Sequence, residues 1–188
     1  TAGVHERASD RSAEAIQIIE RETGNNFELV AMIQGDEPLI LPEMISSGIQ
    51  PLLDDPKLQI SNLVAELKNI EEFEDPNEVK VVIDNKGYAL YLSREPIPSR
   101  KKYNRDIPMI KQLGIIFFRK DFLIQYSTMP QTTLEIIESV DVLRILENNI
   151  KIKTVMTDFE SIGVDTPAEL NRAEEIMKKD MLINKYLT

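Results

Sequence analysis

The sequence of 188 residues contains no cysteine, which excludes disulfides, thiolate metal sites and a thiol nucleophile at once. It also lacks any apolar run near the roughly 20 residues that a membrane-spanning helix needs. No stretch shows the order of basic, apolar and small residues that is typical of a signal peptide. We therefore expect a protein that has no membrane span and that resides in the cytoplasm.

Positive charge is scarce relative to negative charge. The chain has 22 lysines and arginines against 32 aspartates and glutamates, a net charge of −10, and its basic residues are interleaved with acidic ones. Because no basic stripe is available to follow a phosphate backbone, we expect no nucleic-acid partner. An acidic protein that binds a nucleoside triphosphate needs local arginines and lysines together with a divalent cation.

The pattern of apolar residues predicts one α/β domain over residues 1–188, a length that suits one core rather than two. We predict strands at 27–33, 59–67, 79–83, 88–92, 112–118 and 152–156. We predict helices at 10–22 with Asp10 as the cap, at 42–53, at 134–147 and at 167–178. Strands that alternate with helices indicate a mostly parallel sheet, into which residues 77–118 are inserted as an antiparallel hairpin or flap.

Two aspartates stand in glycine-containing loops that follow predicted strands. Asp36 follows the strand at 27–33, and Asp165 follows the strand at 152–156. Open α/β sheets bind ligands at the carboxyl ends of their strands. Two carboxylates brought together there repel one another unless a hard cation such as Mg²⁺ lies between them. We therefore predict a magnesium site.

The alternative for each aspartate is a local role in capping a turn or a helix. For Asp165 this alternative is weakened, because the T-P-A-E segment at 166–169 already supplies an N-cap, a proline for the first helical position and a capping-box glutamate. For Asp36 a tight turn formed by its glycine and proline neighbours at 35 and 38 stays open beside the metal role.

Five short segments follow one another along the chain: Q-G-D-E-P at 34–38, N-E-V-K-V-V at 77–82, G-Y-A-L-Y-L-S-R at 87–94 with I-P at 97–98, L-E at 134–135 with E at 138 and L-R at 143–144, and G-V-D-T-P at 163–167. In this order they resemble the CMP-Kdo synthetases, the 3-deoxy-manno-octulosonate cytidylyltransferases. The resemblance implies a Rossmann-like, GT-A-like nucleotidyltransferase fold and a homodimer formed through the antiparallel hairpin. It also implies transfer of CMP from CTP to an acidic 3-deoxy keto-sugar, with release of pyrophosphate, as in lipopolysaccharide biosynthesis.

The resemblance implies roles for individual residues. Asp36 and Asp165 become the catalytic metal ligands, and the catalytic Arg94 binds an anionic group, which we expect to be the sugar carboxylate. Glu135 and Glu138 lie on a helix near the substrate. Two glutamates three residues apart are also typical of an exposed acidic helix face, so that alternative stays open for this pair.

Residues 5–11, H-E-R-A-S-D-R, resemble the family's H-x-S-G-T-[DE]-R loop, which approaches the cytidine. Ser9 and Arg11 keep a hydroxyl and a guanidinium for contacts with the base or the phosphates. Ala8 replaces a glycine and so removes a position at which positive φ is freely allowed. Arg7 is an added charge.

Two glutamines complete the expected substrate-binding set. Gln34 of the Q-G-D-E-P segment lies beside the sugar or the nucleotide. Gln112 stands before L-G-I, where the family commonly has a histidine that helps to hold the sugar. A neutral amide cannot carry the positive charge of an imidazolium, so we expect either Kdo or a related acidic sugar.

The family has a further segment before the motif at 5–11. Roughly the first third of a complete enzyme, including a strand and a phosphate-binding loop rich in Arg, Lys and Gly, precedes that motif, and we expect the natural protein to contain it. Two other functions stay open. One is a catalytically inactive, truncated homologue that acts as a binding or dimerisation module, and the other is a nucleotidyltransferase that acts on a different acid.

Overall fold

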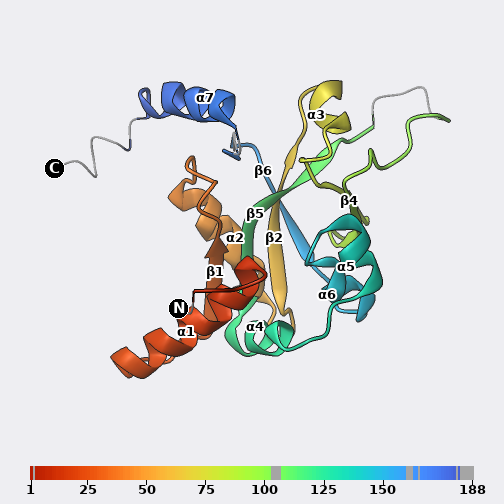
Figure 1. The fold of residues 1–188 in the computed structure, drawn as a ribbon. Coiled ribbons are helices and arrows are strands. Elements are labelled where there is room, and N and C mark those ends of the chain that lie inside the picture. Colours follow the sequence, from red (N-terminus) through yellow and green to blue (C-terminus); the bar gives the residue numbers. More distant parts are fainter. Residues whose placement is uncertain (2, 103–106, 160–162, 165, 181, 183–188) are drawn as a thin grey trace.

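One mixed sheet forms the centre of the chain (Figure 1). The computed structural model describes residues 1, 3–102, 107–159, 163–164, 166–180 and 182. The strands in this part of the chain are β1 (Leu29–Ile33), β2 (Ile60–Glu66), β3 (Lys80–Ile83), β4 (Ala89–Ser93), β5 (Ile110–Arg119) and β6 (Lys153–Thr157). They lie in the order β4-β3-β5-β2-β6, and β1 also pairs with β5. The predicted α/β class is confirmed.

The strand directions explain why the sheet is mixed. β5 pairs antiparallel with β1, β2 and β3, and β3 pairs antiparallel with β4, whereas β2 and β6 pair in parallel. It follows that β1, β2, β3 and β6 run in one direction. β4 and β5 run in the opposite direction, and β5 lies in the middle of the sheet. The expectation of a mostly parallel sheet is therefore corrected, because the chain returns through the middle of the sheet rather than over its face.

β5 has two different neighbours along one of its edges. β2 pairs with β5 from Ile110 to Phe118 on one edge. On the opposite edge β3 pairs with β5 at Lys111, and β1 pairs with it from Ile115 to Arg119. The backbone at Gly114 therefore lies in a gap between β1 and β3.

The sheet separates two apolar cores, which the helices cover. The described helices are α1 (Ala8–Thr23), α2 (Pro42–Asp54), α3 (Ile70–Glu74), α4 (Lys120–Ser127), α5 (Thr133–Glu138), α6 (Leu143–Glu147) and α7 (Pro167–Met177). On one face Ile116 and Phe118 pack with side chains of α1, α4 and α6. On the other face Ile115 and Phe117 pack with side chains of α2. A Cβ atom at Gly48 of α2 would lie 2.1 Å from the Phe117 ring, so only glycine allows this close packing.

The predicted insertion at 77–118 consists of two different parts. Its first part is the expected hairpin: β3 and β4 pair antiparallel around a turn in which Gly87 has a φ of 76°. Its second part is β5, whose Ile115, Phe117 and Phe118 are 0% exposed. Residues 110–118 are therefore a central strand and not a flap.

The helices differ from the prediction in three places. The predicted helix at 134–147 is broken into α5 and α6, and Ser139 at the break adopts a φ of 53°. α1 begins at Ala8 with Arg7 in the N-cap position, so Asp10 lies in the first turn and does not cap the helix. The short helices α3 and α4 were not predicted.

α7 begins as predicted. The Thr166 hydroxyl accepts a hydrogen bond from the Glu169 N–H (3.3 Å), and the Glu169 carboxylate accepts one from the Thr166 N–H (2.8 Å), which together form a capping box. Within the described residues, no helix combines the length and the apolar character that crossing a bilayer requires.

Candidate active site

A cavity of about 390 Å³ opens at the gap between β1 and β3. Four of the predicted site residues line it: Gln34, Asp36, Arg94 and Gln112. The wall also contains residues from the start of α1, from the loop at 75–79 and from the turn between α5 and α6. The fold thus brings segments that are far apart in the sequence to one end of β1.

The backbone of Gly114 holds the loop that follows β1. The Gly114 carbonyl accepts a hydrogen bond from the Gln34 N–H at 3.2 Å, and the Gly114 N–H donates one to Glu37 Oε1 at 3.0 Å. A Cβ atom at Gly114 would lie 3.1 Å from Gln34 Cδ. Glu37, whose part in the site was not predicted, therefore fastens the loop, and the glycine lets the Gln34 side chain lie against the strand.

Asp36 presents a carboxylate oxygen to which no described residue donates a hydrogen bond. Its Oδ1 atom is buried and has no hydrogen-bond partner among the described residues. A buried polar atom without a partner is costly and points to an ion or ligand. The Asp36 carbonyl accepts a hydrogen bond from the Val164 N–H at 2.9 Å, so the segment at 163–164 lies against the Asp36 loop. Asp165, the other predicted metal ligand, lies outside the described residues.

Arg94 is held in place by backbone carbonyls. Its Nε donates to the Glu138 carbonyl (2.8 Å), its Nη1 to the Pro76 carbonyl (2.8 Å) and its Nη2 to the Ser139 carbonyl (3.3 Å). Because a guanidinium has five N–H donors, two remain for a ligand. Arg94 therefore presents a fixed positive charge to the cavity, as predicted for a residue that binds an anion.

Glu138 does not line the cavity, and its carboxylate is occupied. It accepts hydrogen bonds from the Tyr91 hydroxyl (3.1 Å), the Ser93 hydroxyl (2.8 Å) and the Arg94 N–H (2.9 Å). Burial by itself would raise the pKa of Glu138, but these hydrogen bonds outweigh burial and lower the pKa below its ordinary value. The predicted substrate contact is therefore corrected: Glu138 positions Arg94.

Glu135 belongs to the core rather than to the substrate site. It is 0% exposed, and its carboxylate forms a two-pronged ion pair with Arg144, with distances of 2.7 Å to Nε and 2.5 Å to Nη2. The Arg144 guanidinium also lies over the Tyr126 ring, 5.0 Å from its centroid. Glu135 therefore neither contacts the substrate cavity nor belongs to an exposed acidic helix face. Its side chain is buried beside the break between α5 and α6.

The two predicted residues from the first motif also lie away from the cavity. Ser9 is 2% exposed, and its hydroxyl contacts Asp141 Oδ2 at 3.4 Å. The Arg11 guanidinium donates to the Thr1 hydroxyl at the surface. The residues of this segment that do line the cavity include Arg7, because α1 begins one turn earlier than the sequence indicated.

A buried lysine fixes the loop at 75–79. Lys80 is 0% exposed, and its Nζ donates to the carbonyls of Asp75 (2.7 Å) and Glu78 (2.6 Å). Burial lowers the pKa of Lys80, and the nearby carboxylates oppose that effect. The loop then presents Glu78, whose carboxylate pairs with Lys111 at 2.8 Å. This ion pair forms part of the cavity wall beside Gln112.

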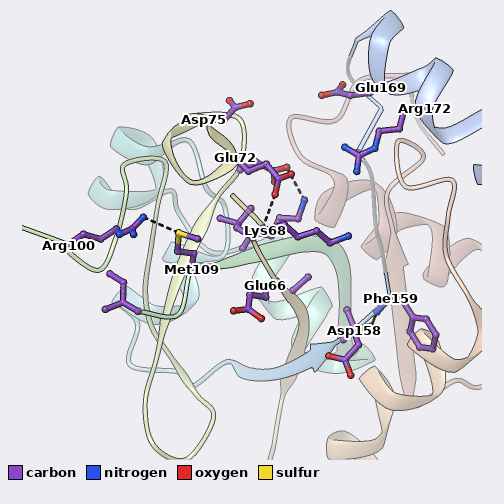
Figure 2. Close-up of a pocket in the computed structure, with 17 residues that line it drawn as sticks. Glu66, Lys68, Glu72, Asp75, Arg100, Met109, Asp158, Phe159, Glu169 and Arg172 are labelled. Carbon is purple, nitrogen blue, oxygen red and sulfur yellow. Dashed lines mark hydrogen bonds and ion pairs between the residues drawn. The ribbon is translucent and has the colours of Figure 1, made fainter. Parts of the chain in front are cut away.

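A second cavity of about 650 Å³ (Figure 2) shares Lys111 and a few other lining residues with the first. Figure 2 shows Glu169 and Arg172 of α7 on one side of it and Lys68 with Glu72 on another. Its charged side chains contact the protein: the Glu72 carboxylate accepts from the Lys68 N–H at 3.1 Å, and Arg100 contacts Met109 Sδ at 3.4 Å. The smaller cavity holds the predicted residues and the unpartnered carboxylate oxygen, so it is the candidate active site.

The unpartnered Asp36 oxygen is a hard donor of the kind that Mg²⁺ takes. Among the described residues, no group of three or more His, Cys, Asp or Glu side chains is arranged to hold a metal ion. Mg²⁺ in nucleotide-dependent enzymes is commonly bound by one or two carboxylates together with substrate phosphates. The unpartnered Asp36 oxygen in a cavity that also contains Arg94 meets that requirement.

Comparison with known proteins shows the family to which the chain belongs. Residues 1–152 match the family model described as cytidylyltransferase, and the chain belongs to this family. Among its relatives are the 3-deoxy-manno-octulosonate cytidylyltransferases of Trichlorobacter lovleyi and Geotalea uraniireducens. Each is 42% identical over 189 aligned residues, and each alignment covers 95% of this chain and 73% of the relative.

A solved structure has the same fold. It is that of CMP:2-keto-3-deoxy-manno-octonic acid synthetase complexed with CTP, and it superposes with a TM-score of 0.82 at 32% sequence identity. The superposition covers 93% of this chain and 69% of that chain. The fold class that the sequence motifs implied is therefore confirmed.

Proposed function

We propose that this protein transfers CMP from CTP to 3-deoxy-manno-octulosonate or a closely related acidic keto-sugar. The anomeric hydroxyl of the sugar attacks the α-phosphorus of CTP, the bond from that phosphorus to the bridging oxygen breaks, and pyrophosphate leaves. The observation that carries the proposal is the buried, unpartnered Asp36 oxygen in a cavity with the immobilised Arg94. The relatives named above act in the same way according to their names.

The chain contributes position and charge rather than covalent chemistry. Arg94 binds the carboxylate of the sugar, and its three backbone hydrogen bonds keep it in one orientation. Gln34 and Gln112, which both line the cavity, supply amide groups for the sugar hydroxyls. Phosphoryl transfer needs little else from a protein, because orientation and charge stabilisation account for most of the rate.

We propose Mg²⁺ as the cofactor, with Asp36 and Asp165 as its protein ligands. The ion supplies neutralisation of the charge on the triphosphate. The support for this assignment is the unpartnered Asp36 oxygen and the contact of the 163–164 segment with the Asp36 loop. Replacement of Mg²⁺ by Ca²⁺, which has the same charge and a looser coordination geometry, is expected to preserve CTP binding and to reduce turnover.

The test is release of pyrophosphate by the natural full-length protein that contains this chain. CTP, Mg²⁺ and a panel of sugar acids are supplied, and UTP replaces CTP in a parallel series. We expect release only with CTP and a 3-deoxy keto-sugar acid. Binding of the sugar without release supports the inactive module instead, and release with another acid or with UTP supports a different nucleotidyltransferase.

We also propose a homodimer that resides in the cytoplasm and serves lipopolysaccharide biosynthesis. The support for the dimer is the hairpin: β4 is the outer strand of the described sheet, and its Leu90 is 60% exposed. An exposed strand edge with an apolar side chain favours pairing with a second chain. Sedimentation velocity measures the mass in solution, and a monomer at all concentrations contradicts the dimer.

A further inference from the structure

The cavity contains one cationic side chain that the protein leaves available. Within the described part of the chain, the cations in its wall are Arg7, Arg94 and Lys111. Arg94 donates three hydrogen bonds to carbonyls, and Lys111 is paired with Glu78. Arg7 lines the same cavity and donates no side-chain hydrogen bond within the described residues. Among the residues that the structure describes, its guanidinium thus donates to no other group, although its charge acts on Asp141.

Arg7 lines the same cavity as the turn that holds Arg94. It occupies the N-cap position of α1 with an extended backbone, φ −134° and ψ 155°. The turn between α5 and α6 places Asp141 in the cavity wall. Burial raises the pKa of the Asp141 carboxyl, and the charge of Arg7, which lines the same cavity, opposes that rise.

The two arginines therefore lie beside a single turn. Arg94 donates to the carbonyl of Ser139, and Asp141, two residues later, lines the cavity together with Arg7. The Ser9 hydroxyl on α1 also contacts Asp141 at 3.4 Å, so α1 and the turn are in direct contact. Arg7 and Arg94 therefore both border the space in which an anion can bind.

The neighbouring polar residue does not supply charge. Gln112 lines the cavity, but its side chain is a neutral amide. A carboxylate that enters the cavity must therefore obtain its positive partners from the arginines. An arginine can bind a carboxylate through two parallel N–H···O bonds.

We propose that Arg7 is a specificity-determining residue that binds the carboxylate of the sugar acid together with Arg94. Asp141 positions its guanidinium. This inference rests on the proposed function, because it concerns the acceptor sugar of that reaction. It assigns the choice between an acidic and a neutral sugar to a residue at the start of α1.

The experiment compares Arg7→Ala with the unaltered full-length protein and with Arg21→Ala as the matched control. Arg21 belongs to the same helix, is exposed and lies outside both cavities. Each protein is assayed with 3-deoxy-manno-octulosonate and with its analogue in which an amide replaces the carboxylate. KM for the sugar, KM for CTP and kcat are measured separately, and thermal melting confirms that each variant is folded.

We expect Arg7→Ala to raise KM for the sugar acid about 10- to 100-fold, the usual cost of a charge-assisted hydrogen-bond pair. KM for CTP should change less than about twofold, and the variant and the unaltered protein should have similar KM for the amide analogue. Arg7→Lys should recover part of the loss, because it restores the charge without the two-pronged geometry. Arg21→Ala should resemble the unaltered protein.

Three results overturn the inference. An unchanged KM for the sugar acid shows that Arg7 does not bind it, and a raised KM for CTP alone assigns Arg7 to the triphosphate. An equal loss for the acid and the amide shows a structural effect. If the unaltered protein releases no pyrophosphate, calorimetric binding of the sugar acid replaces KM. In that case the proposed function fails. Weaker binding of the sugar acid, but not of the amide analogue, by Arg7→Ala would still support the inference about Arg7. If Arg7→Ala binds the sugar acid as the unaltered protein does, the inference about Arg7 fails as well.

Discussion

The two walls of the cavity are built in different ways. The wall around Asp36 comes from consecutive residues, 34–37, which follow β1 and are fastened to the backbone of Gly114. The opposite wall is assembled from α1, from Arg94 after β4 and from the turn between α5 and α6. In the first wall a buried carboxylate oxygen has no partner among the described residues, whereas behind the second wall the Glu138 carboxylate accepts three hydrogen bonds.

This difference separates residues that meet a ligand from residues that position others. A buried polar group that the protein satisfies contributes to order, whereas one left unsatisfied is a cost that a ligand can remove. Asp36 is of the second kind. Glu135 and Glu138 are of the first kind, although the motif that contains them suggested a substrate contact.

The largest expected effect is on stability, at Glu135. Glu135→Ala leaves the Arg144 guanidinium, which is 4% exposed, without its carboxylate. Removing one partner of a buried ion pair typically costs about 3–5 kcal/mol. Chemical denaturation of this variant and of Glu22→Ala, an exposed control on α1, measures the loss. If the variant is as stable as the unaltered protein but no longer binds the sugar, the prediction that Glu135 contacts the substrate is supported instead.

The next effect is on activity, at Asp36. Asp36→Asn removes the charge that we assign to metal binding, and turnover should fall about 100- to 1000-fold, a loss typical of a residue that stabilises transition-state charge. The melting temperature should stay the same or rise, because the protein supplies no partner for Oδ1. Asp121→Asn is the control, since that side chain is 94% exposed. A destabilised Asp36→Asn variant with full activity would contradict the comparison of the two walls.

Glu138 should affect both sugar binding and acid stability. Glu138→Gln disturbs the contact with the Arg94 N–H, and KM for the sugar should rise about tenfold, as expected for a change of roughly 1.4 kcal/mol. Because its pKa is lowered in the folded protein, Glu138 contributes stability above its unfolded pKa of about 4.5, and that stability is lost as pH falls through the folded pKa. Unfolding curves between pH 3 and pH 7 should therefore show a smaller acid-dependent loss in Glu138→Gln. Identical pH profiles would rule out its positioning role.

The smallest expected effect is at Gly114. In Gly114→Ala the new Cβ lies 3.1 Å from Gln34 Cδ, so the Gln34 side chain must move by a few tenths of an ångström. We expect a roughly three- to tenfold loss of kcat/KM with an almost unchanged melting temperature, because small displacements at a reacting centre affect rate more than stability. Gly3→Ala, which introduces a Cβ with no atom within 4 Å, is the control. An equal loss in both variants would show that Gln34 does not need this position.

The sequence predicted the strands well and their arrangement poorly. Apolar runs such as 112–118 indicate a buried strand, and the structure places β5 there with three side chains at 0% exposure. Nothing in that run indicates that the strand lies between β2 and the β3–β1 edge, because strand order depends on long-range pairing. The break at Ser139 was missed for a similar reason. Its φ of 53° is unusual for serine, and it occurs where the carbonyls of residues 138 and 139 accept from Arg94.

The sequence by itself determined the family, the Q-G-D-E-P loop with Asp36, the hairpin and the capping box of α7, because motifs, turns and caps depend on neighbouring residues. Only the tertiary structure decided that Glu135 is buried, that Glu138 holds Arg94 across 44 residues, and that Ser9 contacts Asp141 across 132 residues. These contacts depend on which faces of distant elements meet. A one-dimensional pattern tells which side chains can be charged, and only packing decides which of those charges stay free for a substrate.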